Sequence, residues 1–194
     1  MVSTNMGTKR KGLVFNMIQW ESDKRWADRF IPEIKRILAE ILIDEAPLEE
    51  DMKHNTDLIV LRNNNNRIAC RVRRYSYIQY SDEFTIRYSR QSGAKTEFGK
   101  LIEGWGDYLF YGISDKECKY LTCWFVGDLR VFRRWLMIQL YRGPENYMPG
   151  IEKRNPDQSS TFRVFQKKEM PPDFIVLEKE YNPEGVTSCK SINL

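Results

Sequence analysis

The chain of 194 residues contains a single histidine and only four cysteines, and it has no long apolar run. One histidine weighs against a histidine-based catalytic triad and against a zinc site. Four scattered cysteines are too few for the disulfide framework of a small secreted protein. Because no apolar stretch approaches the length of about 20 residues that spans a bilayer, and the start lacks the apolar region of a signal peptide, we expect no membrane partner and a cytoplasmic location.

The sequence also lacks internal repeats and a glycine-rich phosphate-binding loop. Its hydrophobic content of 41% is that of a globular chain. We therefore expect residues 1–11 to form a flexible basic tail and residues 12–142 to form one core domain. Residues 143–194 are expected to be an extension packed on the same domain, with a frayed end.

Hydrophobic periodicity predicts a mixed α/β (α+β) fold. A helix is expected from residue 22, interrupted at Pro32, with an apolar stripe at helical spacing from Ile34 to Leu42. Alternating or apolar β-branched runs predict strands elsewhere. The expected strands are 58–61, 68–73, 83–88, 108–112, 123–126, 161–165 and 174–177, and further helices are expected at 95–103 and 129–141.

Residues 58–61 and 68–73 flank a run of four asparagines at 63–66. Asparagine tolerates positive φ, so this run is a plausible turn, and the segment reads as a buried β-hairpin. Asp57 stands directly before the first strand, and Arg71 and Arg73 lie near the end of the second.

This hairpin resembles the core motif of the PD-(D/E)XK, or restriction-endonuclease-like, superfamily. In that family an Asp opens one strand and the next strand carries Glu-x-Lys, with carboxylates that bind Mg²⁺. Here Thr56-Asp57 matches the first part, while Arg71-Val72-Arg73 stands where Glu-x-Lys would be. The predicted order of helix, three strands, helix and strand also agrees with the αβββαβ core of this family. The resemblance implies a mixed central sheet with flanking helices, plus C-terminal additions.

The substitution by arginine bears on catalysis. Arginine neither binds a divalent cation nor acts as a base, so the resemblance implies a degenerate, non-catalytic site and no cofactor. The alternative is a Mg²⁺-dependent nuclease that keeps Asp57 as a metal ligand and uses acidic and basic groups from neighbouring helices. Its candidate catalytic residues are Asp57, Glu97, Lys100 and Glu33, with Glu40 as a further possibility.

Between residues 62 and 90 the chain has seven arginines, no lysine, and two acidic residues. Arginine favours bidentate contacts with phosphate or carboxylate, and interleaved tyrosines supply stacking surfaces. The simpler alternative is a solvated sheet with arginine facing outward. The candidate nucleic-acid-binding residues are Arg71, Arg73, Arg74, Arg87, Arg90, Tyr75 and Tyr77.

The sequence therefore predicts a nucleic-acid-binding protein, of DNA or RNA, on a nuclease-like scaffold. A third hypothesis keeps the arginines but gives them an acidic protein partner, as in an interaction or inhibitor module.

Overall fold

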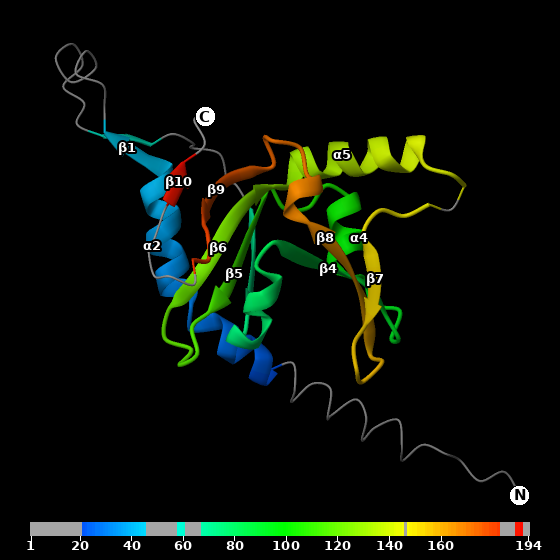
Figure 1. The fold of residues 1–194 in the computed structure, drawn as a ribbon, viewed down its shortest axis with the longest axis horizontal. Helices are drawn as coiled ribbons and strands as arrows, with labels where there is room; N and C mark the ends of the chain where they lie inside the picture. Colours follow the sequence, from blue (N-terminus) through cyan, green and yellow to red (C-terminus); the bar gives the residue numbers. More distant parts are fainter. Residues whose placement is uncertain (1–20, 46–57, 61–66, 146, 183–188, 192–194) are drawn as a thin grey trace, which may run out of the picture. The chain divides into compact units, whose positions relative to one another are not determined.

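The computed structural model describes residues 21–45, 58–60, 67–145, 147–182 and 189–191 (Figure 1). The chain divides into two compact units, Met1–Leu61 and Arg62–Leu194. The proposed binding residues 71–90 all belong to the second unit.

The first unit contains a helix at residues 21–28, followed by helix α2 (Ile31–Leu42). Pro32 is the second residue of α2, where its missing N–H leaves no helical hydrogen bond unmade. The predicted interruption and restart are therefore confirmed. Ile34 and Ile37 of the predicted stripe are buried. Two short antiparallel strands complete the described part of this unit, β1 (Ile43–Glu45) and β2 (Leu58–Val60).

The larger sheet of the second unit has the strand order β10-β9-β6-β5-β3. Strand β3 pairs in parallel with β5, and the other neighbours are antiparallel. All seven residues of β5 are buried, as expected for a strand covered on both faces and paired on both edges. The strands are β3 (Ile68–Arg73), β5 (Tyr108–Ser114), β6 (Leu121–Asp128), β9 (Ile175–Lys179) and β10 (Cys189–Ser191).

The smaller sheet is antiparallel, in the order β4-β8-β7, and lies beside the larger one in Figure 1. Its strands are β4 (Glu83–Arg90), β7 (Ile151–Arg154) and β8 (Ser160–Gln166). Strand β7 was missed by the sequence analysis, because all four of its residues are exposed and they show no apolar alternation.

The predicted helices at 95–103 and 129–141 are confirmed as α4 (Glu97–Ile102) and α5 (Leu129–Arg142). Thr96 and Asp128 cap them, since each side chain accepts a backbone N–H of the first turn. Two short 3₁₀ helices, η1 (Tyr75–Tyr80) and η2 (Lys167–Glu169), complete the unit.

The core of the second unit lies between the two sheets and α5. Phe84 of β4 is fully buried, and its ring stacks on Phe165 and Phe174 at centroid distances of 5.3 Å. It also meets Phe125 and Phe132 edge to face at 5.7 Å. These contacts connect β4, β6, β8 and α5, and such aromatic pairs add to the free energy gained from burial.

The predicted hairpin of 58–61 with 68–73 is wrong about strand pairing. In the part of the chain that the structure describes, β2 pairs with β1, and β3 pairs in parallel with β5. A parallel partner requires a long crossover connection, and the segment between β3 and β5 contains η1, β4 and α4. Asp57 and the asparagine run lie outside the described residues.

The third predicted strand is present as β4, but it joins the smaller sheet rather than following β3 in one sheet. The physical reason is its apolar face, because Phe84 and Ile86 enter the core beside Phe165 of β8. The chain is thus a mixed α+β structure, as predicted. Among the described residues, no helix is both long enough and apolar enough to cross a membrane.

Candidate functional site

Four arginine side chains gather around one glutamate where β3, β4 and α4 meet. Arg71 of β3 donates from Nη1 to Glu97 Oε2 over 2.7 Å and to the backbone oxygen of Thr85 over 3.2 Å. The same glutamate oxygen accepts the backbone N–H of Arg87 over 3.2 Å. We call this group the arginine cluster, and it consists of Arg71, Arg73, Arg87 and Arg90 around Glu97.

Strand periodicity explains why these side chains share one surface. Arg71 and Arg73 are two residues apart on β3, so they project from the same face. On β4, Phe84 and Ile86 are in the core, which leaves Arg87 on the opposite face. Helix α4 packs on β4, and Arg71 of β3 reaches Glu97 in the first turn of α4.

The neighbouring arginines keep the side chain of Glu97 ionised. Burial alone raises the pKa of its carboxyl group, but the charge of Arg71 and the backbone N–H of Arg87 outweigh burial. With the further charges of Arg87 and Arg90, the pKa of Glu97 lies below its ordinary value. The side chain nevertheless keeps 49% of its surface exposed. Glu97 therefore carries a negative charge at neutral pH and neutralises one guanidinium.

The arginines are partly withdrawn from solvent. Burial lowers the pKa of Arg73 and of Arg87, and the like charge of Arg71 lowers both further. A guanidinium still remains protonated at any working pH. Four positive charges thus face one negative charge, an excess of three. Exposed Asp157 lies at the margin, where hydrogen bonds from Ser159 and then the charge of Arg87 lower its pKa.

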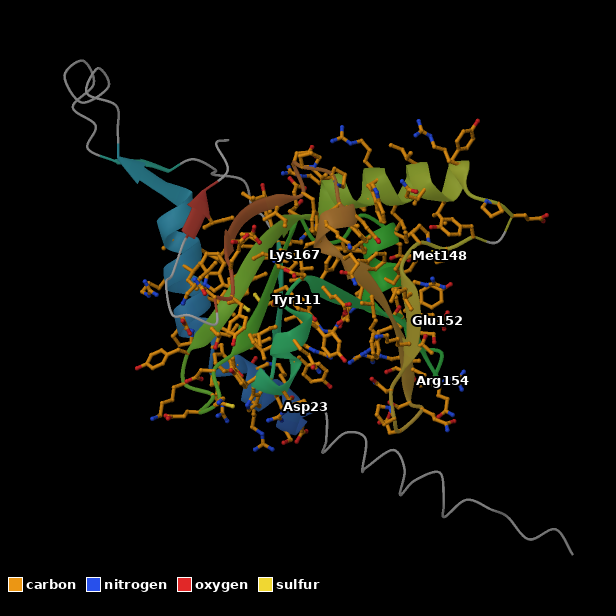
Figure 2. All side chains as sticks on the ribbon, viewed as in Figure 1. Asp23, Tyr111, Met148, Glu152, Arg154 and Lys167 are labelled. Atoms are coloured by element: carbon orange, nitrogen blue, oxygen red, sulfur yellow. The ribbon has the colours of Figure 1, made fainter. Side chains whose placement is uncertain are left out.

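An aromatic hollow of about 160 Å³ adjoins the cluster. The guanidinium carbon of Arg73 lies 4.1 Å from the ring centroid of Tyr77, and Lys153 Nζ lies 5.7 Å from that of Tyr80. The two tyrosines are 41% and 42% exposed. Tyr111 of β5 contributes to the floor and is labelled in Figure 2. The lining residues are Arg73, Tyr77, Tyr80, Glu83, Thr85, Tyr111, Ile113, Lys153, Phe162 and Val164.

The structure brings together five of the seven predicted binding residues: Arg71, Arg73, Arg87, Arg90 and Tyr77.

The other two predicted binding residues are Tyr75 and Arg74. Tyr75 begins η1 and contacts Lys116 instead, with Nζ 5.3 Å from its ring centroid. Arg74 is exposed at the end of β3. Tyr75 is therefore directed to a different part of the surface from Tyr77.

Tyr80, Lys153 and Phe162 line the hollow but are not among the predicted binding residues. Tyr80 lies between residues 62 and 90, where arginines and tyrosines are interleaved, so the composition of this segment could have indicated Tyr80. Lys153 and Phe162 reach the hollow only because β7 and β8 pair, with these two residues directly opposite each other. No local pattern in the sequence gives that pairing.

The predicted catalytic residues are not gathered in one place by the described structure. Glu97 pairs with Arg71, and Lys100 is exposed in the last turn of α4. Glu33 is in the first turn of α2, which belongs to the first unit. Asp57 lies outside the described residues, as does the side chain of Glu40. Within the described ranges, no group of three or more His, Cys, Asp or Glu side chains could hold a metal ion.

Three arginines of α5 lie outside the arginine cluster and have structural contacts of their own. Arg130 pairs with Asp128 over 2.6 Å, Arg133 donates to the backbone oxygen of Gly106 over 2.9 Å, and Arg134 pairs with Asp173 over 3.4 Å. These contacts connect α5 to neighbouring loops.

Comparison with models of protein families, with curated proteins and with solved structures found no match to this chain.

Proposed function

We propose that this chain binds nucleic acid through the arginine cluster, with phosphates as the principal ligands. The observation that carries the proposal is the excess of three positive charges around Glu97, contributed by β3 of the larger sheet and β4 of the smaller one. Like charges held together are electrostatically unfavourable, and an anion with several oxygen atoms relieves this repulsion. Phosphate suits guanidinium groups especially well, because it accepts two parallel hydrogen bonds from each.

The adjacent tyrosines favour nucleic acid over an acidic protein partner. A polyanion of either kind would satisfy the arginines, but a nucleic acid also carries bases with flat faces. Tyr77 and Tyr80 present rings that are 41% and 42% exposed beside the cationic groups. Positive charge together with exposed aromatic rings is the usual composition of a surface that binds single strands.

A restriction-endonuclease-like scaffold remains part of the proposal. It is supported by the order β3, α4, β5 and by the parallel pairing of the two strands. Strand β4 departs from the scheme by entering the other sheet. The nuclease alternative would need Glu97 as a metal ligand, and Arg71 already holds that carboxylate at 2.7 Å. We therefore propose binding without metal-dependent catalysis.

The test is the affinity for a labelled oligonucleotide after the double substitution Arg71→Ala and Arg73→Ala. The matched control is Arg134→Ala with Arg142→Ala, which removes the same charge from exposed positions on α5. We expect the first pair to weaken binding at least tenfold more than the second, as loss of two charge-assisted hydrogen bonds implies.

Equal effects of the two pairs would show that binding depends only on net charge. No binding by the wild type at low salt, combined with capture of an acidic peptide, would support the protein-partner hypothesis instead. Circular dichroism of each variant checks that the fold is retained.

A further inference from the structure

The hollow beside the arginine cluster is lined mainly by aromatic and apolar side chains, which the binding of phosphate alone does not require. It lies between η1 and one face of the smaller sheet, and its volume is about 160 Å³. Tyr77 and Tyr80 line it from η1, and Phe162 and Val164 line it from β8. The hollow is therefore flanked by flat and apolar surfaces, with cationic groups only at Arg73 and Lys153.

Two hydroxyl groups give the hollow hydrogen-bonding capacity. Thr85 Oγ1 and Tyr111 Oη lie 3.3 Å apart, and both side chains are buried. Two hydroxyls have two protons and four lone pairs in all, and their mutual bond uses one of each. Within the hydrogen bonds of the described residues, this leaves one O–H and several lone pairs, which a planar polar ligand can satisfy at its edge.

One carboxylate, that of Glu83, belongs to the lining of the hollow. Its Oε1 accepts from Gln166 Nε2 over 2.6 Å, so the carboxylate is held in place on this lining. A phosphate beside this carboxylate would be repelled, whereas base N–H groups are suitable donors to it. A phosphate would therefore fit the arginine side better than the hollow, and a base would fit the hollow.

We infer that this hollow holds one unstacked nucleobase, with the adjoining phosphate on the arginine cluster, so that the chain prefers single-stranded over duplex nucleic acid. The inference rests on the proposed nucleic-acid binding. Bases in a duplex are stacked and paired, and removing one requires both interactions to be broken. Bases of a single strand reach an aromatic surface without that cost.

The test compares binding of a labelled single strand and of its duplex at one salt concentration. The variants are Tyr77→Ala and Tyr80→Ala, and the matched control is Tyr141→Ala, because Tyr141 is 92% exposed on α5. We expect tighter binding of the single strand. Each tyrosine variant should weaken single-strand binding by about 5- to 150-fold, the range measured for base–aromatic stacking, with duplex binding little changed.

Tyr77→Phe provides a further check, because it keeps the ring that Arg73 covers. Tyr77→Phe should bind the single strand as tightly as the wild type does. The weaker binding of Tyr77→Ala could then be attributed to the loss of the ring. Equal affinity for the two forms, or tyrosine variants that bind as tightly as Tyr141→Ala, would overturn the inference. If binding then still depended on Arg71 and Arg73, the proposed function would survive. If the wild type bound neither form, both would fail.

Discussion

At the scale of single residues, the contact between Arg71 and Glu97 organises the candidate site. It holds a guanidinium with only 17% of its side chain exposed, and the same carboxylate oxygen also accepts the N–H of Arg87. Glu97 thereby reduces the repulsion among the four arginines without cancelling their charge. From the sequence Glu97 was a candidate catalytic residue, whereas its contacts in the structure are those of a counter-ion.

This contact predicts a pH dependence of folding stability. The pKa of Glu97 lies below its ordinary value, because Arg71 and Arg87 outweigh the effect of burial. Its contribution is therefore complete above the unfolded-state pKa of about 4.3 and is lost as the pH falls through the lower folded-state pKa. The wild type should be more stable than Glu97→Gln at neutral pH, by no more than about 1 kcal/mol since the side chain is half exposed.

The measurement is urea unfolding of both proteins between neutral pH and about pH 3. The difference in free energy of unfolding should shrink as the pH falls below about 4.3. Glu145→Gln, which changes an exposed carboxylate, is the matched control. A difference that stays constant, or that grows in acid, would contradict the counter-ion role.

At the scale of elements, β4 contributes both to the core and to the candidate site, because successive side chains of a strand point to opposite faces. One face carries Phe84 and Ile86 into the core, and the other carries Thr85 and Arg87 to the candidate site. The position of Arg87 in the candidate site is therefore fixed by the packing of the opposite face of β4.

Phe84→Ala tests how strongly this element is held. The side chain is fully buried among four other phenylalanines, so we expect a loss of about 3–5 kcal/mol in the free energy of unfolding. Chemical denaturation measures it, and Tyr141→Ala, at an exposed position, should change it by less than about 0.5 kcal/mol. A small effect of Phe84→Ala would mean that β4 does not connect the two sheets as described.

The elements themselves could largely be predicted from the sequence, because periodicity is a local property. Strands β4, β5, β6, β8 and β9 and helices α4 and α5 are all present close to their expected positions. Strand partners could not be predicted in this way. The alternation in 68–73 indicates a strand and its faces, but nothing in it distinguishes an antiparallel partner at 58–61 from a parallel one at 108–113.

For the candidate site, too, residues that follow a local sequence pattern could be predicted, and residues that depend on strand pairing could not. Arginine without lysine between residues 62 and 90 indicated Arg71, Arg73 and Arg87 as one group, and the structure brings their side chains together. Lys153 was not predictable, because it reaches Tyr80 only through the pairing of β7 with β8.

At the scale of the whole molecule, a net charge of +4 gives little indication of polyanion binding. The informative feature is distribution. Arg130, Arg133 and Arg134 of α5 are paired with carboxylates or backbone oxygens, while the four arginines of the arginine cluster share one glutamate. Local excess charge, more than net charge, sets the field that a phosphate experiences.

The same excess of charge predicts that the protein does not cleave DNA or RNA efficiently with Mg²⁺ or Mn²⁺. A guanidinium roughly 5 Å from a divalent cation is unfavourable by about 7 kcal/mol at an effective dielectric of about 20, which would leave a metal site here largely empty. Incubation with plasmid and single-stranded substrates under both metals is the measurement. Cleavage that disappears in an Asp57→Ala variant would contradict the prediction and support the nuclease alternative.

The most direct test of the central claim is the salt dependence of single-strand binding. Each phosphate contact contributes about 0.7 to the slope of log affinity against log salt on a single strand. The double variant Arg71→Ala and Arg73→Ala should therefore have a slope shallower than that of the wild type by roughly 1.4, while Arg134→Ala with Arg142→Ala keeps the wild-type slope. Parallel lines for the wild type and the first double variant would contradict the claim that the arginine cluster binds phosphate.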